Sequence, residues 1–271
     1  MNTEFTNLKT SSKWILEKYI QLEEILENSA QNFEFAQSVE AIYSFLWDDY
    51  ADWFVEYLKT DESQIIFAKE LFRQFTITAS PYIPFETEAL WVEFFGQNEL
   101  LAFELKDQNW SQNVLVQNMQ IDSNKFVQVV EIITQLRSIK GLFGLDPVTR
   151  LEIFCDQEWL LDFDKFLKVT AKVDLNIEKK TGLYTFEVEQ NHISLDILKY
   201  IKDKKAETDR TNKLMENLSK QISALQNQLK NESFLQKADP EIILDKKSDL
   251  AQRQKEMEAQ KNKLVLIEGL I

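Results

Sequence analysis

The sequence predicts a mainly α protein: a helical bundle, a small α/β connector and a C-terminal antiparallel coiled-coil hairpin. Three observations lead to this fold class. Apolar and aromatic residues recur at helical spacing through the first half, the segment after residue 148 alternates as strands do, and residues 199–271 carry widely spaced apolar positions. Five glycines and four prolines in 271 residues leave few tight turns, so we expect long elements.

Five amphipathic helices are expected in the bundle. The clearest spans residues 33–59, where apolar and aromatic residues step by one, three or four positions and form a wide stripe. We interpret Trp47, Trp53 and Trp91 as core residues, because they fall on apolar faces. An irregular stretch is expected around Trp110. The remaining helices are predicted at residues 12–28, 63–79, 87–95 and 123–140.

The residues that follow the bundle predict a small α/β unit. The motif TRLEIFC at residues 149–155 alternates like a strand, and residues 159–169 have the pattern of a helix. Further strands are expected at residues 175–177, 183–188 and 192–198. The predicted domains are therefore a bundle at 1–145, a connector at 146–198 and an arm at 199–271.

The arm carries two apolar seams with heptad-like spacing. A turn near residues 231–240 contains Pro240 and separates them, which predicts two antiparallel helices. The first seam contains Leu214, Leu218, Ile222, Leu225 and Leu229, and the second contains Ile243, Leu250, Met257, Leu264 and Ile271.

Charge is distributed unevenly along the chain. The net charge is −14, yet residues 199–237 hold nine basic and five acidic residues. Residues 239–271 hold six basic and seven acidic residues, which leaves residues 1–198 with a net charge of −17. A basic segment attached to an acidic body indicates a contact with a polyanion, or else simply a solvated lysine-rich helix. The single cysteine, Cys155, excludes an intrachain disulfide and fits a reducing compartment. No apolar run approaches the roughly 18 residues of a membrane span, so we expect a cytoplasmic protein without a membrane partner.

Residues suited to catalysis or to metal binding are scarce. The sequence has no glycine-rich phosphate loop, and the only histidine, His192, is interpreted as a solvent-facing strand residue. Asp48, Asp49 and Asp52 lie on the polar side of the aromatic helix, where capping, ion pairing or solvation explains them better than a metal site. We therefore expect no catalytic residue, metal or cofactor in this chain.

Three motifs, in this order, resemble class I valyl-tRNA synthetases. They are FEFAQSVEAIYSFLWDDYADWFVEYLK at residues 33–59, SPYIPFETEALW at residues 80–91 and LKNESFLQKADPEII at residues 229–243. Ser80 stands where that family usually has histidine, and Asp239 is inserted before Pro240. The first two motifs also suit isoleucyl or leucyl relatives, whereas the third favours the valyl type.

The resemblance implies the anticodon-binding bundle and coiled-coil arm of such a synthetase. Its partners would be tRNA, specifically valine tRNA, and a separate catalytic domain or subunit. The synthetase signatures His-x-Gly-His and Lys-Met-Ser-Lys-Ser are absent, so this part of a valine–tRNA ligase should be inactive alone. The acidic body keeps an alternative open, a freestanding non-catalytic module that binds a protein partner.

Candidate RNA-binding residues lie in two places. Arg137 and Lys140 end the fifth helix, where they could meet phosphate or complement the helix dipole. The resemblance implies that the arm leans on the tRNA, which makes its basic residues candidates. These are Lys202, Lys204, Lys205, Arg210, Lys213 and Lys220.

Overall fold

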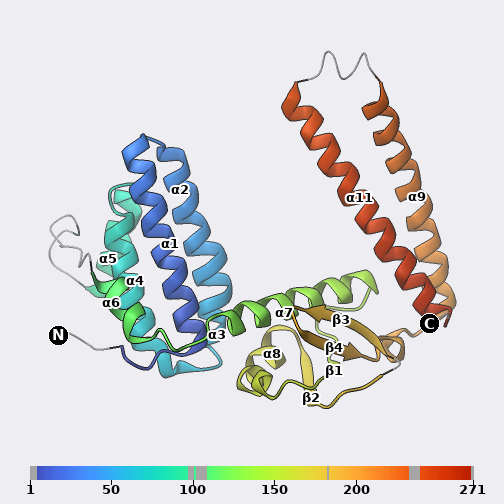
Figure 1. Cartoon of the computed structure of the whole chain (residues 1–271), viewed down its shortest axis with the longest axis horizontal. Coiled ribbons are helices and arrows are strands. Elements are labelled where there is room, and N and C mark those ends of the chain that lie inside the picture. The colour runs from blue at the N-terminus through green and yellow to red at the C-terminus, as the bar shows by residue number, and fades with distance from the viewer. Residues whose placement is uncertain (1–4, 97–100, 102–108, 182, 232–238, 270–271) are drawn as a thin grey trace. The chain divides into compact units, whose positions relative to one another are not determined.

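The computed structural model describes residues 5–96, 101, 109–181, 183–231 and 239–269 (Figure 1). The chain divides into two compact units, residues 1–132 with 165–170, and residues 133–164 with 171–271. The protein is mainly α, as predicted. The predicted three-domain boundaries after residues 145 and 198 stay predictions.

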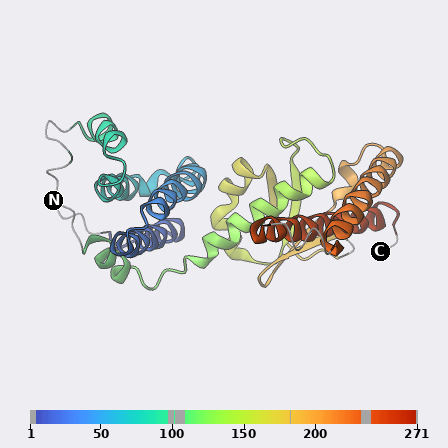
Figure 2. The same ribbon diagram turned by 90° about the horizontal axis from the view of Figure 1, so that it is seen from above.

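The first unit is helical, and α1 and α2 lie side by side in it (Figures 1 and 2). The helix predicted at residues 33–59 is present as a continuous run of α2, a π-helical segment η1, and α3. The elements of the unit are α1 (Thr10–Asn32), α2 (Phe35–Ser44), η1 (Phe45–Val55), α3 (Glu56–Leu58), η2 (Glu62–Gln64), α4 (Ile65–Ala79), α5 (Pro84–Phe95), α6 (Trp110–Gln117), the first part of α7 (Asn124–Leu142) and most of α8 (Asp164–Thr170).

Helix α5 shows how local chemistry sets the ends of an element. It begins at Pro84, three residues before the predicted start, because proline fits the first helical turn, where its missing N–H needs no partner. It ends at Phe95, and the Gly96 that caps it has a φ of 58°, in the left-handed region that favours glycine.

The core of the first unit is aromatic. The Trp14 and Phe126 ring centroids lie 4.9 Å apart, and those of Phe45 and Phe75 lie 5.3 Å apart. Trp91 is 1% exposed, which confirms its predicted place in the core. Tilted and edge-on rings of this kind add favourable contacts to the burial of their large apolar surfaces.

Helix α6 was not predicted, because eight residues contain too little of the apolar period to be recognised. The buried Asn118 directly after it holds the N-terminal segment of the described chain. Its side-chain amide donates to Phe5 O at 2.6 Å and to Val114 O at 2.8 Å, and its Oδ1 accepts from Leu8 N at 2.9 Å. Because α6 begins at Trp110, the expectation of an irregular stretch around that residue was wrong.

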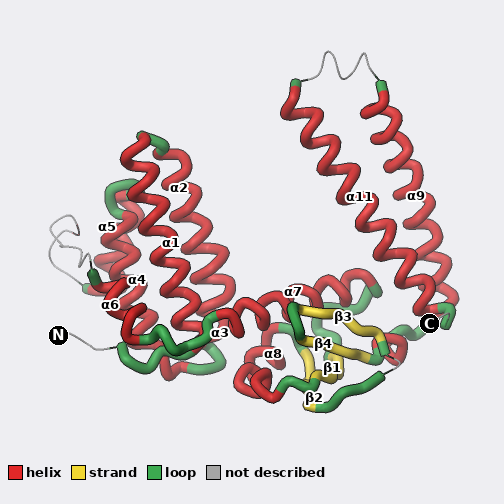
Figure 3. Tube along the Cα trace, viewed as in Figure 1, coloured by secondary structure: helices red, strands yellow, loops and turns green. Residues whose placement is uncertain are grey.

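The second unit contains one small mixed sheet (Figure 3). Its strands are β1 (Leu151–Cys155), β2 (Val173–Ile177), β3 (Tyr184–Val188) and β4 (Asn191–Leu195), in the order β2-β1-β4-β3. Strands β1 and β2 are parallel, with Leu151 opposite Val173, while β4 is antiparallel to both β1 and β3. All four strands match predicted ones, although β4 ends at Leu195 instead of residue 198.

Short helical turns replace parts of two predicted elements near this sheet. The helix predicted at residues 159–169 consists of a 3-10 turn, η4 (Glu158–Phe163), followed by α8. The residues expected to extend the last strand form η5 (Ile197–Tyr200), a second 3-10 turn.

The arm consists of α9 (Lys204–Lys230) and α11 (Pro240–Ile267), which lie side by side and run in opposite directions (Figures 1 and 2). Asp203 caps α9, accepting from Ala206 N at 2.9 Å. Most of the turn predicted at residues 231–240 lies outside the described residues. The described part of each seam is only partly covered, and Leu214 is 39% exposed. Within the described residues, none of the helices combines the length and apolar content that a membrane crossing needs.

Candidate nucleic-acid interface

The predicted basic residues between positions 202 and 220, just before and within α9, are exposed. Lys220 Nζ lies 2.7 Å from Glu216 Oε1, and this bond holds the pKa of Glu216 below its usual range. Exposed pairs of this kind are weak, so the ammonium stays accessible to a phosphate. The exposed lysines of the predicted set are Lys202, Lys204, Lys205, Lys213 and Lys220.

Three of these lysines share one face of α9. At about 100° per residue, Lys205, Lys213 and Lys220 fall within an arc of about 80° and spread along about 22 Å of helix. The seam residues from Leu214 to Leu229 fall on the opposite side of the same helix. The lysines therefore form a cationic face, defined here as Lys205, Lys213 and Lys220, that is separate from the surface packed on α11.

Lys140 does not belong to such a surface. It is 3% exposed, and its Nζ donates to Ala171 O at 2.7 Å and Pro147 O at 3.1 Å. Burial lowers the pKa of Lys140, and the charges of Lys172 and Arg137 lower it further. Lys140 thus holds two chain segments together, which contradicts its predicted contact with phosphate. Arg137 is exposed on α7 and remains a candidate.

Arg210 contacts the protein itself. Its Nη1 lies 3.8 Å from Glu207 Oε2, and a Cβ placed on Gly144 would lie only 2.3 Å from Nη1. The guanidinium therefore packs directly against the backbone of Gly144, although more than half of the side chain is exposed. A structural contact is established for Arg210, and a phosphate contact stays a prediction.

An aromatic ladder on α2 and η1 is exposed instead of buried. We define it as Phe35, Val39, Tyr43 and Trp47, which follow one another every four residues. Tyr43 and Trp47 are 61% and 57% exposed, and their rings stack at 6.3 Å with an interplanar angle of 13°. The prediction that Trp47 lies in the core is therefore wrong.

The ladder begins in the α-helical turns of α2 and continues into η1. From Phe45 to Val55 the helix is π-wound, so successive side chains advance by a smaller angle than in an α-helix. A stripe drawn with the α-helical period therefore drifts relative to the packed face from Phe45 onward, but Phe35, Val39 and Tyr43 are already exposed before that segment. Phe45, which lies off the predicted stripe, is buried, whereas Trp53 is half-buried.

Acidic residues near the ladder make polar contacts within the protein. Asp48 accepts from Ser44 Oγ at 2.7 Å, and Asp49 pairs with Lys18 at 3.4 Å. Burial raises the pKa of Asp49, and Lys18 partly opposes that shift. Asp52 is exposed. These contacts agree with the predicted roles in ion pairing and solvation.

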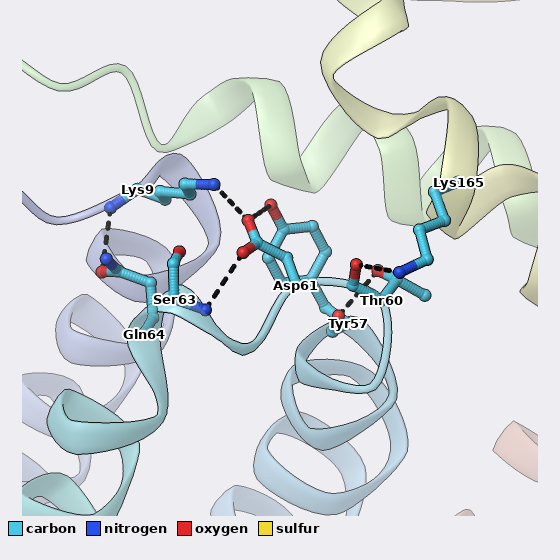
Figure 4. Close-up of polar contacts among 7 residues, drawn as sticks. All are labelled: Lys9, Tyr57, Thr60, Asp61, Ser63, Gln64 and Lys165. Carbon is cyan, nitrogen blue, oxygen red and sulfur yellow. Dashed lines mark hydrogen bonds and ion pairs between the residues drawn. The ribbon is translucent and has the colours of Figure 1, made fainter.

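A polar cluster joins the N-terminal segment to the turn before α4 (Figure 4). Asp61 accepts from the Lys9 ammonium and, at 3.1 Å, from Ser63 N. Lys165 of α8 donates to Thr60 O at 2.8 Å. Burial alone would raise the pKa of Asp61, but the hydrogen bonds from Lys9 and Ser63 outweigh it and lower that pKa. Since its charged groups satisfy one another, the cluster is structural.

His192 lies on β4 with its side chain exposed, as predicted. Its Nδ1 lies 2.9 Å from Glu187 Oε1, directly across the β3–β4 pair. Cys155 is buried, and burial raises the pKa of its thiol, so a nucleophilic thiolate is disfavoured. In the part of the chain that the structure describes, no group of three or more His, Cys, Asp and Glu side chains could hold a metal ion.

Comparison with known proteins agrees with the motifs. The family model described as the anticodon-binding domain of tRNA ligase matches residues 12–154, more than half of the chain. The valine–tRNA ligase of Thermotoga maritima is 26% identical over 258 residues, covering 90% of this chain and 29% of that relative. The enzyme of Mycolicibacterium paratuberculosis is 25% identical, with coverages of 92% and 29%. That of Mycoplasmoides gallisepticum is 24% identical, with coverages of 95% and 30%.

The chain thus spans about 30% of the length of these relatives. The similarity extends beyond the bundle into the residues of the sheet and arm, since the family model ends at residue 154 while the relatives cover at least nine-tenths of the chain. The predicted resemblance is confirmed: the chain belongs to the family of anticodon-binding domains of tRNA ligases.

Proposed function

We propose that this chain is the tRNA-binding part of a valine–tRNA ligase and works in the cytoplasm. The helical unit docks the anticodon side of valine tRNA, and the arm contacts the body of the tRNA. The observation that carries this proposal is the family match over residues 12–154, combined with similarity to valine–tRNA ligases along about nine-tenths of the chain. The catalytic work belongs to a separate domain or subunit.

The cationic face of α9 supports a contact with the sugar–phosphate backbone. Residues 199–237 carry a net charge of +4, whereas residues 1–198 carry −17, so phosphate is attracted to the arm and repelled by most of the remaining surface. Lysine offers a point charge with little selectivity for bases. The arm therefore positions tRNA, and base selection falls to other contacts.

A charge-reversal variant tests this contact. Changing Lys205→Glu, Lys213→Glu and Lys220→Glu together should weaken binding of valine tRNA, and should flatten the log–log dependence of affinity on salt by about two to three units. A matched control changes the exposed Lys59, Lys69 and Lys179 to glutamate, which alters the net charge equally. Equal binding by both variants at every salt concentration would refute the arm contact.

The activity of the chain alone is a separate expectation. Purified chain should give no valine-dependent exchange between ATP and pyrophosphate, because the sequence carries neither synthetase signature that holds ATP. Exchange above a buffer blank would overturn the assignment of catalysis to another domain.

The aromatic ladder favours a second candidate function, binding of a protein. Glu34, Glu40 and Asp48, which are close to the ladder in the sequence, are also exposed. Their charges repel phosphate but suit a basic, partly apolar protein surface. Under this reading, Tyr43→Ala with Trp47→Ala should abolish association with a ligase catalytic domain while tRNA binding by the arm persists. Loss of tRNA binding alone would instead assign the ladder to RNA.

A further inference from the structure

Three helix ends meet at the base of the arm. These are the last residue of α7, the first turn of α9 and the end of α11 that approaches them. Lys263 of α11 joins all three, because its Nζ donates to Leu142 O at 2.5 Å and to Glu207 Oε1 at 2.5 Å. One lysine therefore links α11 both to α9 and to the end of α7.

The position of this lysine is electrostatically favourable and nearly dry. The Lys263 side chain is 1% exposed and that of Glu207 is 13% exposed. Leu142 O is one of the last carbonyls of α7, which have no partner inside the helix and carry its negative dipole end. The ammonium also lies 5.4 Å from the centre of the Phe143 ring.

Arg210 and Gly144 make a second contact at the same place. The guanidinium packs on Gly144, whose φ of 62° is left-handed, and a side chain at residue 144 would displace the guanidinium. Glu207 thus lies between two cations, Lys263 at 2.5 Å and Arg210 at 3.8 Å. The polar contacts of one glutamate order both helices of the arm at their base.

Buried ion pairs contribute little net stability, because desolvation offsets their attraction, but their geometry is strict. The seam between α9 and α11 is partly exposed and so constrains the arm weakly along its length. We propose that Lys263 and Glu207 are positioning residues, which fix the base of the arm on the end of α7 and so orient the cationic face of α9. The orienting role toward RNA rests on the proposed function.

Replacing the pair by apolar residues separates positioning from stability. Lys263→Met alone should lower the melting temperature, since Glu207 loses its buried partner. Lys263→Met with Glu207→Leu should recover the melting temperature, because packed apolar residues substitute well for a buried pair. The arm should nevertheless lose its fixed direction. A control makes Arg253→Met and Glu256→Leu, a more exposed pair on α11 whose atoms lie 2.9 Å apart.

Arm direction is measured as a distance distribution between two spin labels. Cys155→Ala removes the single cysteine, and labels are placed at Lys179→Cys beside the sheet and Ala224→Cys on α9, both exposed positions. The parent and the Arg253/Glu256 control should give one narrow distribution, and the Lys263/Glu207 double variant a broad or displaced one. A narrow, unshifted distribution in the double variant would overturn the proposal.

Binding of valine tRNA gives a second, independent readout. The double variant should bind at least about tenfold more weakly with unchanged helix content, because a misdirected arm cannot add its contacts to those of the rest of the chain. Unchanged affinity together with a broadened distribution would show that the pair orients the arm but not toward RNA. If even the parent failed to bind tRNA, the proposed function would fail, while the distances would still test the pair.

Discussion

The helical unit and the arm are stabilised in different ways. Helix α1 buries eleven of its 23 residues, whereas α9 buries only Thr211 among 27. The bundle therefore rests on a continuous aromatic core, and the arm rests on a partly covered seam and on polar contacts at its base. The difference shows that apolar periodicity predicts helices in both regions, whereas the depth of packing distinguishes a bundle with a buried core from an arm with little buried surface.

The largest expected effect is in the aromatic core. Phe126→Ala removes a fully buried ring that contacts Trp14 and Phe166, and should lower the free energy of unfolding by about 3–5 kcal/mol. Urea denaturation measures this loss. Phe85→Ala, at a ring that is 86% exposed, is the control and should change little. A small effect at Phe126 would remove the contrast between bundle and arm.

A charge in the arm seam should act locally. Leu218→Asp places a carboxylate in the partly buried α9–α11 seam and should unfold the arm, with the helical signal falling while the bundle keeps its melting temperature. Circular dichroism across a thermal scan measures both. Ser219→Asp, one residue away and exposed, should be tolerated. Melting of the whole protein together at a lowered temperature would place the arm in the main core.

Acid should weaken the polar cluster at Asp61. Its pKa is lowered from the ordinary 3.8, so its contribution to stability is present above that value and is lost as the pH falls through the folded-state pKa. Asp61→Asn should therefore reduce stability at neutral pH by up to about 1 kcal/mol, and should flatten the decline below about pH 4. Unfolding free energies across pH test this, with the exposed Glu62→Gln as control. Parallel pH curves for Asp61→Asn and the parent would contradict it.

The smallest expected effect is at the aromatic ladder. Trp47→Ala should change the unfolding free energy by no more than about 0.5 kcal/mol, because the ring is 57% exposed. Trp91→Ala is the matched tryptophan in the core and should destabilise by several times that amount. Similar losses of unfolding free energy in the two variants would show that Trp47 is packed as a core residue.

The sequence predicted element types better than it predicted which side chains are available for binding. Helices and strands follow from periodicity and from Pro84 and Gly96, which act locally. The exposure of Trp47 depends on which face of α2 and η1 packs on α1, and the burial of Lys140 depends on carbonyls at residues 147 and 171. Such contacts leave no local pattern. For the same reason Lys263, next to a predicted seam position, gave no signal of its role.

The measurement that tests the central claim most directly is a titration of the unmodified chain with valine tRNA over a salt series. If the exposed lysines contact the sugar–phosphate backbone of the tRNA, binding is measurable at low salt. The logarithm of the affinity then falls linearly with the logarithm of the salt concentration. Three phosphate contacts on the cationic face alone give this log–log plot a slope of about −2 or steeper. Absence of binding at low salt, or an affinity that does not change with salt, would contradict the account.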